Sequence, residues 1–550
     1  MIKRTGILFI FGILFLPCYS QLTGYKYDVS KKVFDAIVSA YGRSITPPVF
    51  EIRQKNYPGK KQILMYYPGE QPKIIMDEDV YDLCTGLGSD SLNALAAMLG
   101  HELAHHYEKH NWCSSFAYLL DEKDDLKQKL SKMTKEEKLR LEAEADYFGG
   151  FYGYVAGFPT FDVSAKLLDK IYAYYKLPDK IDGYPTKEDR KQIASKSLKE
   201  LEQYQAVFDA GETMLCLKEY ETAAGCFEFL ADKFPSREMF GNVGVAKVLA
   251  AMDFIDEKTM PFALPLEMDA GTRLKSGAVR GTGMSAEEKE RQKKLLLETA
   301  IKYFDKAISV DPSYTNALIN KGCAYLLLNN PEMAVGITND FILQTNKYNS
   351  HDLSKAHSLR AIALYTKGEK EKAGDDFEQA QKLSSITRNK YNLAVYKVMN
   401  KGMMNTLMDY VASYFEDEKA SAYGKEKVIN PSLEKIGNES AGQLNTAKGN
   451  EVKIPSEKPV LISFLPHDTY KDLRIKDERA YRILITGDKY SGKTSQGIGK
   501  MESIENIKLK YGEPTYTVAE IKGFYLVYRK SRIVFFLNQN NRLIKWFTYY

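Results

Sequence analysis

The chain has 550 residues, of which 44% are hydrophobic and 27% charged. This ordinary globular composition excludes a wholly disordered, collagen-like or disulfide-scaffold protein, and the length predicts about three or four domains. The net charge of +5 at pH 7 is small for this length, so we expect no nucleic-acid partner.

The first 20 residues are typical of a secretory signal peptide. Lys3-Arg4 precedes an apolar stretch over residues 6–16, and small residues precede Gln21. The apolar stretch is too short for a membrane-spanning helix, which needs about 20 residues. We therefore predict cleavage before Gln21 and a mature protein that is periplasmic or secreted.

The cysteines leave two questions open. Cys18 could instead carry a lipid anchor, although Leu16-Pro17 before it is a poor match to the small residues normally found there. After removal of residues 1–20 an odd number of cysteines remains, so at least one thiol is unpaired. We expect most of them to be buried thiols, while a Cys84–Cys113 bridge stays open. The remaining cysteines are Cys84, Cys113, Cys216, Cys226 and Cys323.

Residues 21–200 predict a domain that mixes strands and helices. Short strand-like stretches lie at 62–67 and 73–76. The segment 93–110 (NALAAMLGHELAHHYEKH) then has helix-forming composition and holds four of the chain's seven histidines. Such a concentration of imidazoles predicts a metal site.

The metal motif within this helix is His101-Glu102-Leu103-Ala104-His105. A spacing of four residues places both imidazoles on one helical face, as two ligands of a zinc ion must be. Glu102 stands beside them, where it can take a proton from a water that the ion activates. A catalytic zinc also needs a third protein ligand, which this motif does not contain.

The two other histidines of the helix are expected to stay off the metal. His106 lies about 100° further around the helix than His105. We therefore expect it at the helix surface or behind the ligands. We expect His110 to pack or to form a hydrogen bond.

A second helix-forming stretch begins near Thr134 and contains Leu141-Glu142-Ala143-Glu144-Ala145-Asp146. With both motifs, the chain over roughly residues 30–200 resembles the HtpX and CAAX-prenyl-endopeptidase family of zinc metallopeptidases, whose histidine motif is followed by a Glu-x-x-Ala-Asp helix. The resemblance implies a zincin-type domain with one Zn²⁺ per chain and Glu142 as the third ligand. It implies that Asp146, one turn later, orients a ligand imidazole. Glu144 is the alternative ligand, but its spacing from Asp146 is less suitable.

The chemistry implied by this resemblance is hydrolysis of a peptide bond, with Glu102 as general base. The group that would stabilise the oxyanion stays open between Tyr147, Tyr184 and Arg190. Relatives often carry His-Pro in a loop before an arginine, whereas this chain has Tyr184-Pro185 before Arg190. Regulation of the zinc by a downstream histidine, as thought for periplasmic relatives of the BepA type, is therefore in doubt here.

Residues 201–415 predict helices that repeat with the spacing of the tetratricopeptide (TPR) family, so we expect an α-solenoid. Ala300 and Ala334 are 34 residues apart, which is the period of that family. An insertion at about 257–284 interrupts the array. The matching positions are Gly211, Tyr220, Ala223, Phe227 and Pro235; Ala300, Phe304, Ala307 and Pro312; Gly322, Tyr325 and Ala334; and Ala361, Gly368, Ala373, Phe377 and Ala380.

The polar stretch 416–455 has the composition of a linker, because it contains Asn-Pro and Gly-Asn pairs. Residues 456–550 then predict a small α/β domain of unknown role. We expect a helix over 502–510 and antiparallel strands at 524–529, 533–537 and 543–549.

One motif in this last region is misleading. The segment 487–494 (GDKYSGKT) satisfies the phosphate-loop pattern and follows a strand-like stretch. The next residues, 495–499, look like a loop where a helix should begin, and too few residues follow for a parallel sheet. We therefore expect no nucleotide binding.

Taken together, these features predict an α+β, mainly helical protein: an exported zinc endopeptidase that acts on protein or peptide substrates. Envelope protein quality control is the natural setting, and the repeats would bind substrates or an envelope protein complex. The alternative is a TPR chaperone or assembly adaptor whose peptidase site is latent or inactive.

Overall fold

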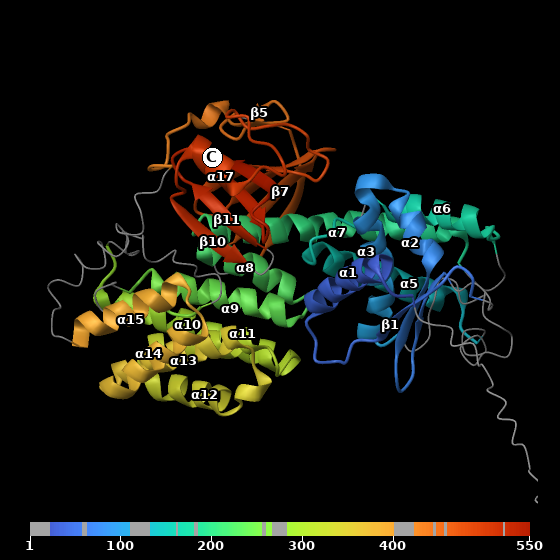
Figure 1. Ribbon diagram of the computed structural model, residues 1–550. Helices are drawn as coiled ribbons and strands as arrows, with labels where there is room; N and C mark the ends of the chain where they lie inside the picture. Colours follow the sequence, from blue (N-terminus) through green and yellow to red (C-terminus); the bar gives the residue numbers. More distant parts are fainter. Residues whose placement is uncertain are drawn as a thin grey trace, which may run out of the picture. The chain divides into compact units, whose positions relative to one another are not determined.

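The computed structural model describes residues 22–57, 63–110, 132–160, 163–180, 185–255, 260–266, 283–400, 423–443, 447–455, 459–520 and 523–550. The chain divides into two compact units (Figure 1), the first with the described residues up to 40 and those of 45–198, the second with residues 41–44 and those from 199 to 550. The predicted signal peptide, Cys18 and Cys113 lie outside the described residues. Within the described ranges no helix has the length and apolar character needed to cross a bilayer.

The first unit combines a three-stranded sheet with helices. The strand order is β1-β3-β2; β1 and β3 run parallel, and β2 and β3 antiparallel. The predicted strands at 62–67 and 73–76 are confirmed as β2 and β3. The elements are α1 (Tyr25–Tyr41), β1 (Val49–Arg53), β2 (Leu64–Tyr67), β3 (Lys73–Asp77), α2 (Glu78–Thr85), α3 (Ser91–Tyr107), α5 (Lys135–Val155), α6 (Ser164–Tyr175) and the beginning of α7 (Lys187–Cys216).

The start of α5 is fixed by a capping box. The Thr134 hydroxyl accepts a hydrogen bond from the Glu137 N–H (3.2 Å), and the Glu137 carboxylate accepts one from the Thr134 N–H (2.8 Å). This reciprocal pair satisfies donors that a helix start leaves unbonded. The helix predicted to begin near Thr134 is therefore confirmed.

Two glycines let α3 and α5 cross in direct backbone contact. A Cβ atom at Gly149 would lie 2.5 Å from the carbonyl carbon and oxygen of Gly100, and one at Gly100 would lie 2.7 Å from the Gly149 oxygen. No side chain fits in that space, so a larger residue at either position must push the two helices apart.

The second unit contains a row of helices in which each helix from α8 to α15 packs on the next. Helices α9, α11 and α13 also contact one another in turn, so they form one layer. The helical character that the sequence predicts for this region is thus confirmed in its described residues. The helices are α8 (Tyr220–Ala231), α9 (Arg237–Met252), α10 (Ala286–Val310), α11 (Thr315–Leu327), α12 (Pro331–Leu343), α13 (Ser350–Thr366), α14 (Lys370–Leu383) and α15 (Thr387–Asn400).

Small residues face aromatic rings between these helices. A Cβ atom at Gly211 would lie 2.8 Å from the Phe227 ring, and one at Gly244 would lie 2.4 Å from the Phe304 ring. The alanines and phenylalanines of the predicted repeat positions are buried. The expectation that small residues admit aromatics between paired helices therefore holds at these positions.

The C-terminal part of the second unit is an eight-stranded antiparallel sheet, in the order β10-β11-β12-β13-β9-β8-β7-β6. The predicted helix and the three predicted strands are confirmed as α17, β11, β12 and β13. The elements are β4 (Lys435–Ile436), β5 (Glu439–Ser440), β6 (Asn450–Ile454), β7 (Val460–Pro466), β8 (Tyr470–Lys476), β9 (Ala480–Thr486), α17 (Ile504–Tyr511), β10 (Tyr516–Glu520), β11 (Gly523–Tyr528), β12 (Ile533–Asn538) and β13 (Leu543–Tyr549).

The predicted linker 416–455 is wrong over its described part. Residues 450–454 form the edge strand β6, and Ile436 is buried in the core of the sheet domain. The buried Glu434 carboxylate accepts hydrogen bonds from the Tyr511 hydroxyl (2.6 Å) and from the Ser495 hydroxyl (2.6 Å) and N–H (3.0 Å). The Asn-Pro and Gly-Asn pairs make turns inside the domain, which composition alone does not distinguish from turns between domains.

The sheet domain docks on the first helices of the repeat region. The Tyr516 hydroxyl donates to the Cys216 carbonyl (2.6 Å), and the Lys471 ammonium lies 2.7 Å from the Asp209 carboxylate. The Tyr481 hydroxyl donates to Glu219 (2.8 Å). Sheet and helices are therefore held by hydrogen bonds and ion pairs from several strands.

The segment with the phosphate-loop pattern has the context that its sequence predicts. It follows β9, a strand of the antiparallel sheet, and the Thr494 N–H donates to the Ile498 carbonyl (2.8 Å) to close a turn. The next helix, α17, begins only at Ile504. Residues 495–499 thus form a loop, as expected.

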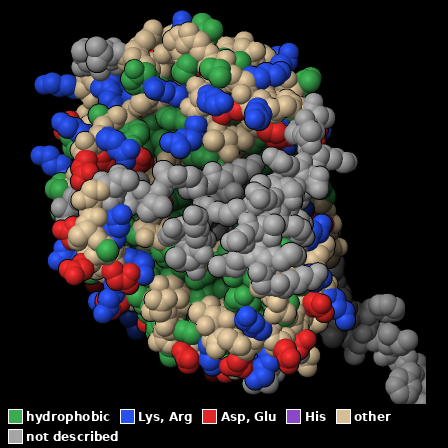
Figure 2. Space-filling view, turned by 90° about the vertical axis from the view of Figure 1, so that its left-hand side faces the viewer, with side chains coloured by type: hydrophobic (Ala, Val, Ile, Leu, Met, Phe, Trp, Pro, Cys, Tyr) green, Lys and Arg blue, Asp and Glu red, His purple; other side chains and the backbone are tan. Residues whose placement is uncertain are grey.

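The surface and the thiols also follow the composition. On the face in Figure 2, basic side chains predominate in the upper part, basic and acidic ones are mixed below, and hydrophobic ones are visible toward the middle. Four cysteines are buried free thiols, as expected for most of them: Cys84, Cys216, Cys226 and Cys323.

We predict that Glu434→Ala lowers the free energy of unfolding of the second unit by about 2–4 kcal/mol, because the buried Tyr511 hydroxyl and the Ser495 hydroxyl and N–H lose a buried, charged acceptor. Denaturant unfolding followed by circular dichroism measures it. Glu451→Ala, an exposed site on β6, should change it by less than about 0.5 kcal/mol. Equal effects of the two substitutions would contradict the assignment of residues 423–443 to the folded domain.

Candidate metal centre

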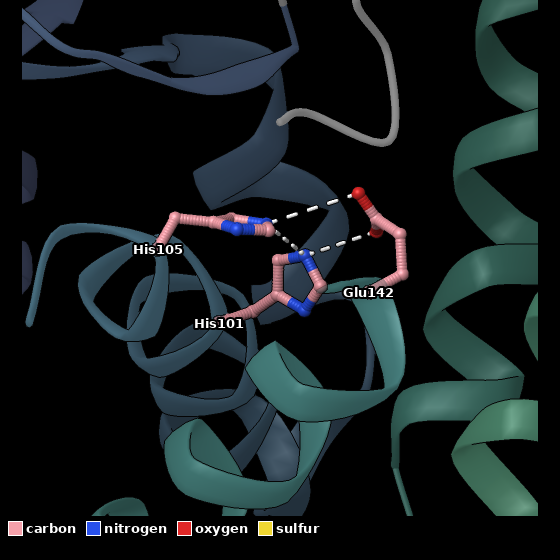
Figure 3. A group of neighbouring side chains, drawn as sticks. All are labelled: His101, His105 and Glu142. Carbon is pink, nitrogen blue, oxygen red and sulfur yellow. Dashed lines mark hydrogen bonds and ion pairs between the residues drawn. The ribbon is translucent and has the colours of Figure 1, made fainter. Parts of the chain in front are cut away.

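The site is built where α3 and α5 face each other. His101, Glu102 and His105 lie on α3, and Glu142 and Asp146 lie on α5. Because the Gly100–Gly149 contact brings the two helices to backbone distance, side chains near the crossing reach one another directly. Figure 3 shows the His101 and His105 rings and the Glu142 carboxylate pointing toward one point. The structure therefore brings together all three residues expected to bind zinc.

The separations of the three donor groups suit one tetrahedral ion. The Nε2 atoms of His101 and His105 are 3.1 Å apart, and the Glu142 carboxylate oxygens lie 3.3 Å from His101 Nε2 and 3.8 Å from His105 Nε2. Ligands about 2.0–2.1 Å from a tetrahedral zinc lie about 3.3 Å from one another. Among the described residues these three are the group of acids, histidines and cysteines close enough to share an ion, and two imidazoles with one carboxylate are a donor set that suits zinc.

Each candidate imidazole ligand is held from behind by its other nitrogen. His101 Nδ1 lies 2.7 Å from Asp146 Oδ1, so it donates to that carboxylate and leaves Nε2 free for a metal. His105 Nδ1 lies 2.9 Å from His110 Nδ1. With His105 as donor in that pair, its Nε2 also carries a lone pair toward the site.

His110 also lies near an acid of α5, since its Nε2 is 3.6 Å from Glu144 Oε2. The contact between His105 Nδ1 and His110 Nδ1 confirms the expectation that His110 forms a hydrogen bond, although its partner could not be read from the sequence. Glu144, the alternative third ligand, therefore lies near His110, whereas Glu142 is the acid that faces both candidate imidazole ligands.

Burial sets the charge of the second imidazole. Desolvation, together with the nearby His101 and His110 rings, lowers the pKa of His105 well below its ordinary value. The ring is therefore neutral at physiological pH, and a neutral imidazole is the form that binds a metal.

Glu102 is almost completely shielded from water, with 1% of its surface exposed. Its Oε2 accepts a hydrogen bond from the Tyr66 N–H of β2 (2.7 Å). Burial raises the pKa of this carboxyl to about 7, against the smaller opposing effects of His101 and the Tyr66 N–H. The strand thus fixes one carboxylate oxygen beside the metal ligands, and nothing in the sequence motif indicated this contact.

Arg190 reaches the site from α7. One guanidinium nitrogen contacts Glu142, and another lies 3.7 Å from Asp146 Oδ1. Of the other oxyanion candidates, Tyr184 lies outside the described residues. Tyr147 is about 140° around α5 from Glu142 at 100° per residue, and its ring packs edge-on against Phe148. Arg190 is therefore the candidate that the structure brings to the acids of the site.

His106 points away from the candidate ligands, as expected from its position on the helix. It is buried rather than at the helix surface: its Nδ1 lies 3.2 Å from the Tyr66 hydroxyl and its Nε2 donates to the Thr46 carbonyl (3.0 Å). The expected surface position is wrong because the sheet covers that side of α3. This imidazole ties α3 to the strands.

The comparisons with known proteins are sparse. No protein-family model and no curated protein matches this chain. Among solved structures, the chain is similar to a thermophilic TPR protein of Thermus thermophilus, with 14% identity over 51% of this chain and 99% of the other and a TM-score of 0.24. A likeness this slight establishes neither fold nor function.

We predict that Gly149→Ala lowers the free energy of unfolding by about 1–3 kcal/mol and weakens zinc binding, because the new methyl group separates α3 from α5. Gly336→Ala is the matched control: this exposed glycine in α12 has no atom within 4 Å of the added Cβ, so the helix should gain about 0.5–1 kcal/mol. Thermal unfolding and zinc titration measure both changes. Unaltered zinc affinity in Gly149→Ala would refute the role of the crossing.

We also predict that Glu142→Gln reduces zinc affinity at least 100-fold, since a neutral amide replaces an anionic ligand. Glu144→Gln removes a charge two residues away on the same helix and should leave affinity within a few fold. Asp146→Asn should reduce it about 10–100-fold, because the His101 imidazole loses its acceptor. Competition with a zinc-sensitive chelator measures all three, and the reverse order for Glu142 and Glu144 would show that Glu144 is the ligand.

Proposed function

We propose that this protein is a zinc-dependent endopeptidase that hydrolyses peptide bonds of protein substrates. The observation that carries the proposal is the convergence of two imidazole nitrogens and a carboxylate at ligand spacing, with a buried glutamate next in sequence to the first imidazole. The resemblance of residues 30–200 to the HtpX and CAAX-prenyl-endopeptidase family supports the same chemistry.

In this proposal His101, His105 and Glu142 hold one Zn²⁺ ion. When bound, the ion supplies a Lewis acid that polarises the scissile carbonyl and acidifies a water. Glu102 takes the proton of the attacking water and returns it to the leaving amine. Its Oε2 is held by the Tyr66 N–H, so Oε1 is the oxygen that receives the proton.

The surrounding residues hold these groups in place. Asp146 and His110 keep the two imidazoles in the tautomer that presents Nε2. Arg190 offsets the negative charge of Glu142 and Asp146, and in this proposal its guanidinium would also stabilise a developing oxyanion. Exclusion of water from the buried Glu102 strengthens each of these interactions.

The repeats of the second unit would recruit protein substrates or a partner complex, since stacked helix pairs present extended binding surfaces. The predicted signal peptide places this activity in the periplasm or outside the cell. Envelope protein quality control is the setting that joins an exported peptidase to a protein-binding array.

The second candidate is a chaperone or assembly adaptor with a latent site. It is favoured by the contact of an arginine with Glu142, because a cation there competes with a metal for the same carboxylate. Both candidates predict protein binding, and only the peptidase predicts turnover.

We predict that Glu102→Gln lowers kcat for peptide hydrolysis by about 10²–10⁴-fold and leaves zinc content unchanged, since this residue touches the water and not the metal. Cleavage of a denatured protein substrate, followed by mass spectrometry, measures turnover. Glu136→Gln, at an exposed position in the first turn of α5, serves as the control with normal activity. Equal hydrolysis by the wild-type protein and Glu102→Gln would remove the peptidase proposal and leave the adaptor.

A further inference from the structure

Residues 260–266 (MPFALPL) cross the helical repeats without forming a helix or strand of their own. They belong to the insertion between α9 and α10, and their side chains from Phe262 to Leu266 are buried. The segment contacts α13, α14 and α15, which lie about a hundred residues later in the chain, through Tyr365, Phe377 and Asn392. The segment therefore lies on the repeats as a bound peptide would.

One amide side chain forms two hydrogen bonds with the backbone of this segment. Asn392 of α15 accepts a hydrogen bond from the Ala263 N–H through Oδ1 (2.8 Å) and donates one to the Ala263 carbonyl through Nδ2 (2.8 Å). The Tyr391 hydroxyl donates to the Pro261 carbonyl (2.8 Å). These contacts read main-chain groups, so they do not depend on the side chain at position 263.

The Asn392 side chain is also held by its own surroundings in the repeats. Asn392 is fully buried, and its Nδ2 also lies 3.3 Å from the Ser358 hydroxyl of α13. A buried amide is costly unless its donors and acceptor are satisfied. Here the main chain of a segment outside any helix or strand satisfies both ends of the amide, whereas apolar packing alone would require no such residue.

Side chains of the segment add selectivity. The Phe262 ring stacks on Phe377 with centroids 5.2 Å apart and meets Tyr365 edge-on at 5.2 Å. Leu264 and Leu266 are buried in the same hydrophobic core. The surface thus accepts an aromatic residue just before the residue that is hydrogen-bonded to Asn392, and aliphatic residues after it.

The helical row does not depend on the segment for its continuity. Helices α9 and α10 pack directly on each other, as do α13, α14 and α15 in succession. Release of residues 260–266 from α13, α14 and α15 would break the hydrogen bonds to Asn392 and Tyr391 and expose apolar side chains. It would not interrupt any contact between these helices.

We propose that the surface formed by α13, α14 and α15 is a binding site for extended apolar peptides with an aromatic residue, and that residues 260–266 occupy it in cis as a competing ligand. The ligand class is an unfolded or loop segment with the pattern aromatic-small-aliphatic. The main chain of its small residue forms the hydrogen bonds with Asn392. This deepens the substrate-recruiting role of the repeats and is independent of the metal chemistry, so the two can fail separately.

A tethered ligand has a high effective concentration, in the millimolar range for short linkers. An external peptide must therefore bind in competition with it. Substitutions that weaken the binding of residues 260–266 to this surface should raise the affinity for the external peptide. Removing the Asn392 amide should abolish binding of that peptide, with or without those substitutions.

The test uses Glu102→Gln as the background, so that no peptide is cleaved. Fluorescence anisotropy measures binding of a labelled MPFALPL peptide. The additional substitutions Phe262→Ala and Leu264→Ala should tighten Kd at least tenfold, and Asn392→Ala added to them should abolish binding. Leu295→Ala, at an exposed position on α10, is the control without effect. A folded Phe262→Ala/Leu264→Ala protein that binds no tighter than the background would overturn the proposal.

A second measurement does not depend on how these variants fold. Hydrogen exchange of the Ala263 amide in the Glu102→Gln protein should accelerate as unlabelled MPFALPL is added, while α13 amides keep their protection. The peptide MPAAAPL should have no such effect. Exchange at Ala263 that stays constant at every peptide concentration shows that residues 260–266 are a fixed part of the core, and the proposal then falls.

Discussion

The contact between Gly100 and Gly149 is the constraint on which the candidate metal centre depends. Only two residues without side chains allow α3 and α5 to meet at backbone distance. His101 follows the first glycine directly, while Glu142 and Asp146 lie two turns and one turn before the second. The crossing therefore sets the distance between imidazoles and carboxylates, and each further contact of the site refines a geometry that the two glycines make possible.

Around this crossing, polar contacts from several elements fix the side chains. Asp146 and His110 orient the two imidazoles, the Tyr66 N–H of β2 holds Glu102, and Arg190 from α7 meets the acids. Such a site is pre-organised, because most of its side chains have a partner on a second element. The second unit is organised differently: its helices pair through small residues and aromatic rings, and a segment of the chain itself covers α13 to α15.

The sequence predicted what depends on local spacing. The four-residue step from His101 to His105 defines a helical face, and the Thr134 start of α5 is a local capping signal, so both could be read directly. Glu142 came from a family resemblance. Tyr66 and the packing of Gly100 on Gly149 could not be predicted, since they join segments far apart in sequence and carry no motif. Composition misassigned residues 423–443 and 447–455 for a related reason: turn residues look alike inside and between domains.

The central claim is that His101, His105 and Glu142 bind one zinc ion, and X-ray absorption at the zinc edge of the purified protein tests it most directly. The account predicts one zinc per chain, with two imidazole nitrogens at about 2.0–2.1 Å, oxygen ligands completing the shell and no sulfur. A protein without zinc, or a zinc shell that contains sulfur or lacks imidazole, would contradict it.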